Sequence, residues 1–176
     1  MSTSPSGMDA YLAIVSIRVV RDYTSDPISD AALNRMLQAG RATGSSRNRQ
    51  AWLFYVVRNP ETLNRLADCV FAPDNVRGCQ LAIAIVITGK SSFDGGRAAQ
   101  NMALAAWTDG IGTCPNSTRD IDEARRVLGI TEDLSIATIL SVGYPAAAIS
   151  PKDNNPEAIL SRIDRKPLEE ITRFLD

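Results

Sequence analysis

The chain contains no histidine among its 176 residues. Without imidazole, the usual Ser-His-Asp and Cys-His forms of nucleophilic catalysis are excluded, and so are most zinc and non-haem iron sites. If the protein is an enzyme, we therefore expect a bound cofactor to carry the difficult chemistry.

Cysteines, excess charge and long apolar runs are scarce as well. The three cysteines are an odd number without CxxC spacing, which indicates reduced thiols in the cytoplasm. The net charge of −1 argues against a nucleic-acid or membrane-surface partner, because such binders need a clear basic excess. The longest strong apolar run, Leu81–Ile87, falls well short of the roughly 18 residues of a membrane span.

The length of the chain is most simply that of one domain. The start, Met1–Gly7, lacks the basic and apolar regions of a signal peptide and is typical of a frayed tail. We therefore expect a disordered tail over 1–8 and a single domain over 9–176, without internal repeats.

Helical and strand patterns alternate along the chain, which indicates an α/β or α+β fold. The segment Leu81–Ile87 is apolar on both faces, so we expect it to be a central strand of a sheet. Ser29 and Asn59 are suited to begin helices, and Gly129 is suited to end one. Helices are expected at 9–16, 29–39, 60–68, 97–109 with a start at Asp94, and 121–128. Strands are expected at 52–57, 81–87 and 136–142, and an amphipathic segment at 168–175.

The segment Arg41–Trp52 joins an expected helix to an expected strand and is unusually polar. A connection needed only to turn the chain would use a few residues of glycine, asparagine or proline. This one carries two serines, an asparagine, a glutamine and three arginines, which are donors suited to an anionic or heteroaromatic ligand. We interpret it as a binding loop.

Two glycine-containing segments do not fit nucleotide-binding motifs. Thr88–Ser91 resembles the end of a phosphate-binding loop, but Ala84 stands where that motif requires a glycine. Gly110–Gly112 lacks the third glycine of a dinucleotide fingerprint and follows an expected helix instead of a strand. Neither motif is retained.

Basic residues cluster near both ends of the chain. Arg18 and Arg21 suit a clamp on a phosphate, for which the guanidinium fork is well shaped, although two solvated surface arginines would give the same pattern. Arg165 and Lys166 form a second cluster, which alone would indicate only a charged surface.

Taken together, four segments occur in an order and at intervals that resemble the nitroreductase family of flavoproteins. The resemblance covers residues 9 to 175. It implies an α+β, nitroreductase-like fold with a mixed, mainly antiparallel sheet flanked by helices, built as an intertwined homodimer. The four segments are Arg18–Tyr23, Ser45–Trp52, Gly143–Pro145 and Arg165–Leu168.

The resemblance also implies a chemistry. Family members bind FMN at the dimer interface, where both chains contribute to each site, and they take hydride from NADH or NADPH. Hydride then leaves the flavin for a small-molecule electron acceptor, such as a nitroaromatic or a quinone, in a ping-pong sequence. Because the flavin carries the hydride, no protein nucleophile is required and no catalytic side chain is assigned.

Residue roles follow from the same resemblance. Arg18, Val19 and Arg21 match the entry segment at the FMN phosphate, and Arg165 matches a C-terminal basic residue that serves the same phosphate. The remaining matches lie along the ribityl chain and the ring system. They are Ser45, Ser46 and Asn48 in the loop, and Gly112, Thr113 and Cys114 near the far edge of the isoalloxazine.

Departures from the family pattern leave alternatives open. A deazaflavin could replace FMN, and the protein could bind a flavin for storage or sensing without reductase turnover, or serve as a reductive specialist such as a dehalogenase. The short connector 71–78 predicts an open active site with weak substrate discrimination. The departures are Ile17 and Val19 in place of arginine and serine, Gly44 and Ala51 in place of prolines, Ser117 and Thr118 in place of glycines, and the added charges Arg47 and Arg49.

Overall fold

The computed structural model describes residues 9–90, 92–131, 133–147 and 155–175. The chain forms two compact units. The larger is Ile17–Ile149, and the smaller combines Met1–Ser16 with Ser150–Asp176. The expected tail at 1–8 lies outside the described residues, and a single domain over 9–176 stays a prediction.

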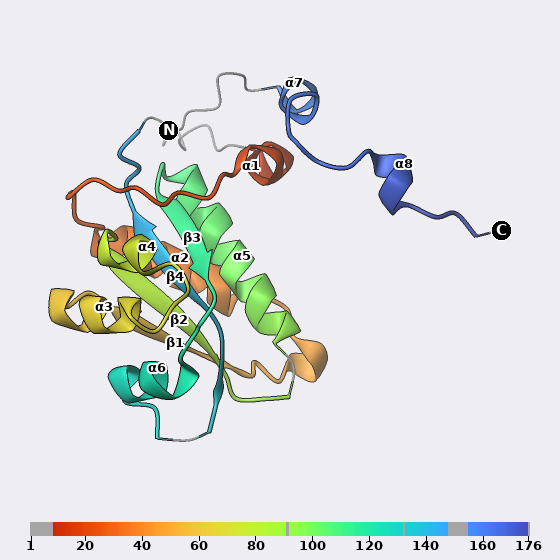
Figure 1. Cartoon of the computed structure of the whole chain (residues 1–176). Coiled ribbons are helices and arrows are strands. Elements are labelled where there is room, and N and C mark those ends of the chain that lie inside the picture. Colours follow the sequence, from red (N-terminus) through yellow and green to blue (C-terminus); the bar gives the residue numbers. More distant parts are fainter. Residues whose placement is uncertain (1–8, 91, 132, 148–154, 176) are drawn as a thin grey trace, which may run out of the picture. The chain divides into compact units, whose positions relative to one another are not determined.

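The larger unit is built on a four-stranded sheet in the order β1-β2-β4-β3. Every neighbouring pair of strands is antiparallel, and Figure 1 shows the strands side by side. The antiparallel sheet agrees with the expected fold class, and the described parallel pairing is the single bridge between Val19 and Thr113. The strands are β1 (Trp52–Val57), β2 (Leu81–Ile87), β3 (Gly112–Asn116) and β4 (Ser135–Gly143).

Strand β2 confirms the prediction of a central strand, because all of its residues are buried and it pairs on both sides. Strand β3 was not predicted. Its sequence, Gly-Thr-Cys-Pro-Asn, contains three residue types that are depleted in strands, glycine, proline and asparagine. Pro115 is tolerated because β3 lies at the edge of the sheet, where one side of the strand needs no ladder partner.

Helices cover both faces of the sheet. On one face, Met36 of α2 and Met102 of α5 pack with the isoleucines of β2. On the other face, Leu66 of α3, Val76 of α4 and Ala124 of α6 pack with the alanines of β2. The alternation of large and small residues along β2 therefore matches its two covers. The helices are α2 (Asp30–Arg41), α3 (Pro60–Ala67), α4 (Pro73–Arg77), α5 (Phe93–Thr108) and α6 (Ile121–Leu128).

The predicted helix ends are confirmed by their capping contacts. The Ser29 hydroxyl accepts from the Ala32 N–H at 3.2 Å, and the Asn59 side chain accepts from the Thr62 N–H at 3.0 Å. Gly129 ends α6 in the left-handed region at φ 69°. Helix α5 begins at Phe93, one residue before the expected start at Asp94. The prediction that differs is the connector 71–78, which contains α4.

The smaller unit contains three short helices. Within it α1 packs against α7, and Ala13 and Ile159 are buried. The amphipathic segment expected at 168–175 is helical only over its first half, and α7 was not predicted. None of the described helices is long and apolar enough to cross a membrane. The three helices are α1 (Ala10–Ser16), α7 (Pro156–Leu160) and α8 (Leu168–Ile171).

Candidate functional site

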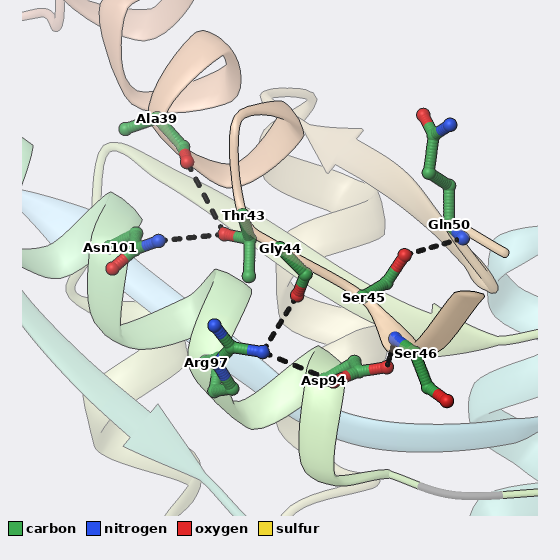
Figure 2. A network of polar contacts seen from close by, with 9 residues as sticks. All are labelled: Ala39, Thr43, Gly44, Ser45, Ser46, Gln50, Asp94, Arg97 and Asn101. Carbon is green, nitrogen blue, oxygen red and sulfur yellow. Dashed lines mark hydrogen bonds and ion pairs between the residues drawn. The ribbon is translucent and has the colours of Figure 1, made fainter. Parts of the chain in front are cut away.

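The predicted binding loop follows α2 and contains the 3-10 turn η1 (Ser46–Asn48). Figure 2 shows that it lies against the first turns of α5. The Arg97 guanidinium donates to the Gly44 carbonyl at 2.8 Å, and the Ser46 N–H donates to the Asp94 carboxylate at 3.1 Å. The Asn101 amide donates to the Thr43 hydroxyl at 2.7 Å. Side chains of α5 thus hold the first half of the loop at three points.

The tip of the loop has an uncommon backbone. Arg47, Asn48 and Gln50 lie in the left-handed region, with φ values of 54°, 54° and 50°. Asparagine tolerates this region, but arginine and glutamine enter it at a cost of roughly 1–2 kcal/mol. Such backbone outliers persist only where the surrounding structure enforces them, and they cluster at functional sites.

The loop presents polar groups that are available to a ligand. The Ser45 hydroxyl accepts from the Gln50 N–H at 2.9 Å and thereby closes the turn. Across the described residues, no hydrogen bond engages the Ser46 hydroxyl or the Asn48 side-chain amide, and both residues are exposed. The exposed charges of Arg47 and Arg49 give this surface a positive potential.

A second group of predicted site residues gathers at β3. Val19 bridges to Thr113, and the Val20 N–H donates to the Thr113 carbonyl at 3.0 Å. A Cβ atom on Gly112 would lie 2.5 Å from the Val20 side chain, so only glycine permits this close approach. The structure therefore places the segment that carries Arg18 and Arg21 directly against the predicted 112–114 segment.

Cys114 in this group is a protected thiol. It is 2% exposed, and burial raises its pKa, while the positive charge of the nearby Arg21 guanidinium lowers it in part. Burial also raises the pKa of the neighbouring Tyr23 hydroxyl, which donates to the Val20 carbonyl at 2.6 Å. Both groups are therefore neutral near pH 7, and Arg21 is the cation of this cluster.

The two groups lie at opposite ends of the sheet. Trp52, which follows the loop, pairs with Ile87 at one end of β2. Thr113 pairs with a residue of β4, Val142, that in turn pairs with Leu81 at the other end of β2. The separation is about 20 Å along the strands and about 14 Å across them. Figure 1 shows the same arrangement, with η1 at one end of α5 and the 17–23 segment near the other.

The sequence profile of the nitroreductase family matches residues 14–73 and 89–144, most of the chain. The chain belongs to the nitroreductase family. It is 30% identical over 145 residues to a candidate NADH dehydrogenase/NAD(P)H nitroreductase of Archaeoglobus fulgidus, and the match covers 75% of this chain and 83% of the relative.

Solved structures of the family have the same fold. A candidate nitroreductase of Desulfovibrio desulfuricans in complex with FMN is 26% identical and has a TM-score of 0.75, covering 96% of this chain and 98% of that one. A nitroreductase family protein of Clostridium difficile, at 21% identity, has a TM-score of 0.80 and covers 95% and 98%.

In this nitroreductase-family chain, the predicted residues of the larger unit form two clusters. Arg165 belongs to the smaller unit, where it is exposed and donates to the Asp164 carbonyl at 2.7 Å. Sequence reasoning missed three residues that hold the candidate site in place. Asp94 and Arg97 hold the loop, and Asn75 holds β3 through its contact with Asn116. Their signal was weak, because polar residues in short helices and helix starts are ordinarily solvated. The roles of all predicted site residues stay predictions.

Proposed function

We propose that the protein is an FMN-dependent NAD(P)H oxidoreductase that reduces nitroaromatic, quinone or related acceptors by ping-pong hydride transfer. We place it in the cytoplasm as a homodimer. Support comes from family membership, from the activity in the name of the Archaeoglobus fulgidus relative, and from the FMN in the complex of the Desulfovibrio desulfuricans protein. The absence of histidine is consistent with chemistry carried by a flavin.

The observation that carries the proposal is the division of the predicted site into two clusters. Within one chain these two clusters lie at opposite ends of the sheet, about 20 Å apart along the strands and about 14 Å across them. In a homodimer related by a two-fold axis, the loop of one chain can meet the β3 cluster of the other. The family resemblance implies such shared sites, and the separation of the two clusters in the single chain supports them.

The residues present fit such a ligand. Arg18, Arg21 and Arg165 are assigned to the phosphate, because partly buried phosphates need two or three cationic or N–H donors. Ser46 and Asn48, with Ser45, are assigned to the ribityl chain and ring, to which their exposed hydroxyl and amide groups can donate. Val19 is assigned to the entry segment at the phosphate, and Gly112, Thr113 and Cys114 are assigned to the far edge of the ring.

Bound FMN would take hydride from NADH or NADPH and deliver it to the acceptor. The protein would bind and orient the cofactor, and donors near the flavin pyrimidine would stabilise the negative charge of its reduced form. Arg21 keeps its assignment to the phosphate, for which it is a cation beside two neutral side chains, Cys114 and Tyr23. The short segment 71–78 supports an open site with broad acceptor specificity.

The test is an anaerobic titration of the purified protein. We expect a yellow protein with the visible absorbance of an oxidised flavin, and a chromophore whose extracted mass is that of FMN. Addition of NADH or NADPH should bleach the colour, and a quinone or nitroaromatic should restore it. Colour that persists with both donors would reject turnover and favour a storage or sensing protein. A chromophore with the mass of a deazaflavin would reject FMN.

The phosphate assignment is tested by Arg18→Ala. Loss of this guanidinium should weaken FMN binding by about 10- to 100-fold, the range for a charge-assisted hydrogen bond. Flavin occupancy equal to that of the unaltered protein would reject the assignment. Arg162→Ala is the control, because Arg162 is an exposed arginine with no assigned role in the site.

A further inference from the structure

The binding loop is held by a charged pair that has no role in the function proposed so far. Asp94 and Arg97 lie one turn apart at the start of α5 and are 3.4 Å apart. Asp94 accepts the Ser46 N–H, and Arg97 donates to the Gly44 carbonyl. Figure 2 shows both side chains directed at the loop. We name these two residues the α5 latch.

The latch contacts the backbone of the loop instead of its side chains. The Ser46 N–H is engaged by Asp94, and the Ser46 hydroxyl is left exposed. Gly44 permits the contact with Arg97, because a Cβ atom there would lie 3.3 Å from the guanidinium. The latch therefore fixes the path of the chain on the N-terminal side of η1 and leaves the ligand-facing groups unoccupied.

The loop needs this restraint for two reasons. Its tip contains three non-glycine residues at positive φ, a conformation that relaxes unless neighbouring structure enforces it. The segment 41–52 also contains no proline, which would otherwise limit its freedom. The Thr43–Asn101 bond restrains the loop nearer α2, but the contacts at Gly44 and Ser46 come immediately before the residues at positive φ.

We propose that Asp94 and Arg97 are positioning residues, which hold the loop in the conformation that receives the flavin. The inference rests on the proposed function, since it gives the loop its ligand. Without the latch the loop samples other conformations, so the apparent affinity falls by the fraction of time that the competent conformation is present. Both contacts are charge-assisted, because an ionised carboxylate accepts one and a guanidinium donates the other, and such bonds are stronger than neutral ones.

The chain supplies its own probe of the loop. Trypsin cleaves after arginine, and Arg47 and Arg49 are both exposed at the tip of the loop. Their rate of cleavage, followed by mass spectrometry without added flavin, measures how often the loop leaves its conformation. Cleavage after Arg65 in α3 is the internal standard for unfolding of the rest of the larger unit.

Asp94→Ala should raise cleavage after Arg47 and Arg49 about tenfold and should weaken FMN binding by a similar factor. Asp94→Asn, whose amide oxygen can still accept the Ser46 N–H, should retain most of the protection and the affinity. Arg97→Gln should have a smaller effect than Asp94→Ala. The matched control is Asp109→Ala, which removes the Arg35–Asp109 ion pair between α2 and the other end of α5. It should change neither the cleavage rate at the loop nor the FMN affinity.

Two outcomes would overturn the proposal. Unchanged cleavage at the loop in Asp94→Ala would show that the latch does not hold it. Faster cleavage with unchanged FMN affinity would show that the held conformation is not the one that the flavin needs. If the unaltered protein binds no flavin, the proposed function fails and the positioning role fails with it. The cleavage comparison, which uses no flavin, would still distinguish that result from the absence of a latch.

Discussion

Asn116 is the residue on which the position of β3 depends. It is 4% exposed, and its Nδ2 atom donates to the carbonyls of Cys114 at 2.9 Å and Ile139 at 3.0 Å. Its Oδ1 atom accepts from the Asn75 side chain at 2.9 Å. A side-chain amide is both donor and acceptor, so one residue connects two strands and α4. The β3 cluster of the candidate site is therefore positioned by a buried hydrogen-bond network.

Asn116→Asp tests this network with little change of shape. The substitution replaces the donating NH2 group by an oxygen that faces two carbonyls, and it leaves buried polar groups without partners. We expect the free energy of unfolding, measured in urea, to fall by about 3 kcal/mol. Asn64→Asp, at an exposed position in α3, should stay within about 0.5 kcal/mol of the unaltered protein. Equal losses in the two variants would contradict the role of Asn116.

The thiol of Cys79 makes stability depend on alkaline pH. Burial raises its pKa from 9.0 to about 11, and its Sγ atom lies 3.0 Å from the Val76 carbonyl. Between these pH values the unfolded chain releases a proton that the folded chain retains, so the unfolding free energy falls as the pH rises. Over two pH units the loss from this group is up to about 3 kcal/mol.

Urea unfolding under reducing conditions between pH 8 and pH 11 measures this slope. Cys79→Ala should show a shallower decline than the unaltered protein across that window, although it starts from a lower stability because the side chain is buried. Identical slopes would show that the thiol titrates at its ordinary pKa in the folded state.

At the scale of the element, α5 contains two adjacent glycines, of which Gly95 is closely packed and Gly96 faces open space. A Cβ atom on Gly95 would lie 2.4 Å from Ile87 Cδ1 and 3.4 Å from the Ala137 Cβ, whereas Gly96 has nothing within 4 Å. Gly95 thus permits close packing of the helix on the sheet. Gly96 only adds conformational freedom to the turn that carries the α5 latch.

Gly96→Ala should raise the unfolding free energy by about 1 kcal/mol, because alanine favours a helix interior and meets no neighbour here. Gly95→Ala should lower it by about 1–3 kcal/mol, because the added methyl group is forced against β2. Thermal unfolding of the two variants, followed by circular dichroism, makes the comparison. Stabilisation by both substitutions would show that α5 does not pack closely on β2 at Gly95.

The elements that could be predicted from the sequence are those whose signals are local. Helices with a capping side chain and strands with an apolar run are located within about two residues of their observed ends, as at Ser29 and Trp52. Strand β3 could not be predicted, because its glycine and proline disfavour strands and its pairing with β4 depends on residues far away in the sequence. The same holds for α4, whose Asn75 contacts Asn116.

At the scale of the whole molecule, the sequence names candidate residues for the site but does not indicate how they group in space. The motifs around Arg18 and Ser46 resemble those of the family, but motif order along a chain says nothing about distance in space. The register of β1, β2, β4 and β3 is what separates the two clusters. The contacts of Asp94 with the loop depend on tertiary packing of the same kind.

A site shared between two chains has a consequence that a site within one chain does not. Arg18→Ala removes the phosphate donor proposed for the β3 cluster, and Asn48→Asp places a negative charge in the loop without changing the size of the side chain. Each homodimer should lose FMN. If each site takes its loop from one chain and its β3 cluster from the other, a heterodimer of the two variants has both changes at one site and neither at the other. It should therefore bind flavin at one of its two sites.

Co-expression of the two variants with different affinity tags, followed by purification over both, isolates this heterodimer. We expect about half the flavin content and half the NAD(P)H-dependent activity of the unaltered dimer, against little of either in the homodimers. The control is a heterodimer in which one chain carries both substitutions, Arg18→Ala and Asn48→Asp, and the other chain is unaltered. If each site is shared, that pair has one damaged element at each site and should bind little flavin. Full occupancy of one site in the control, with none in the heterodimer, would instead place each flavin within one chain.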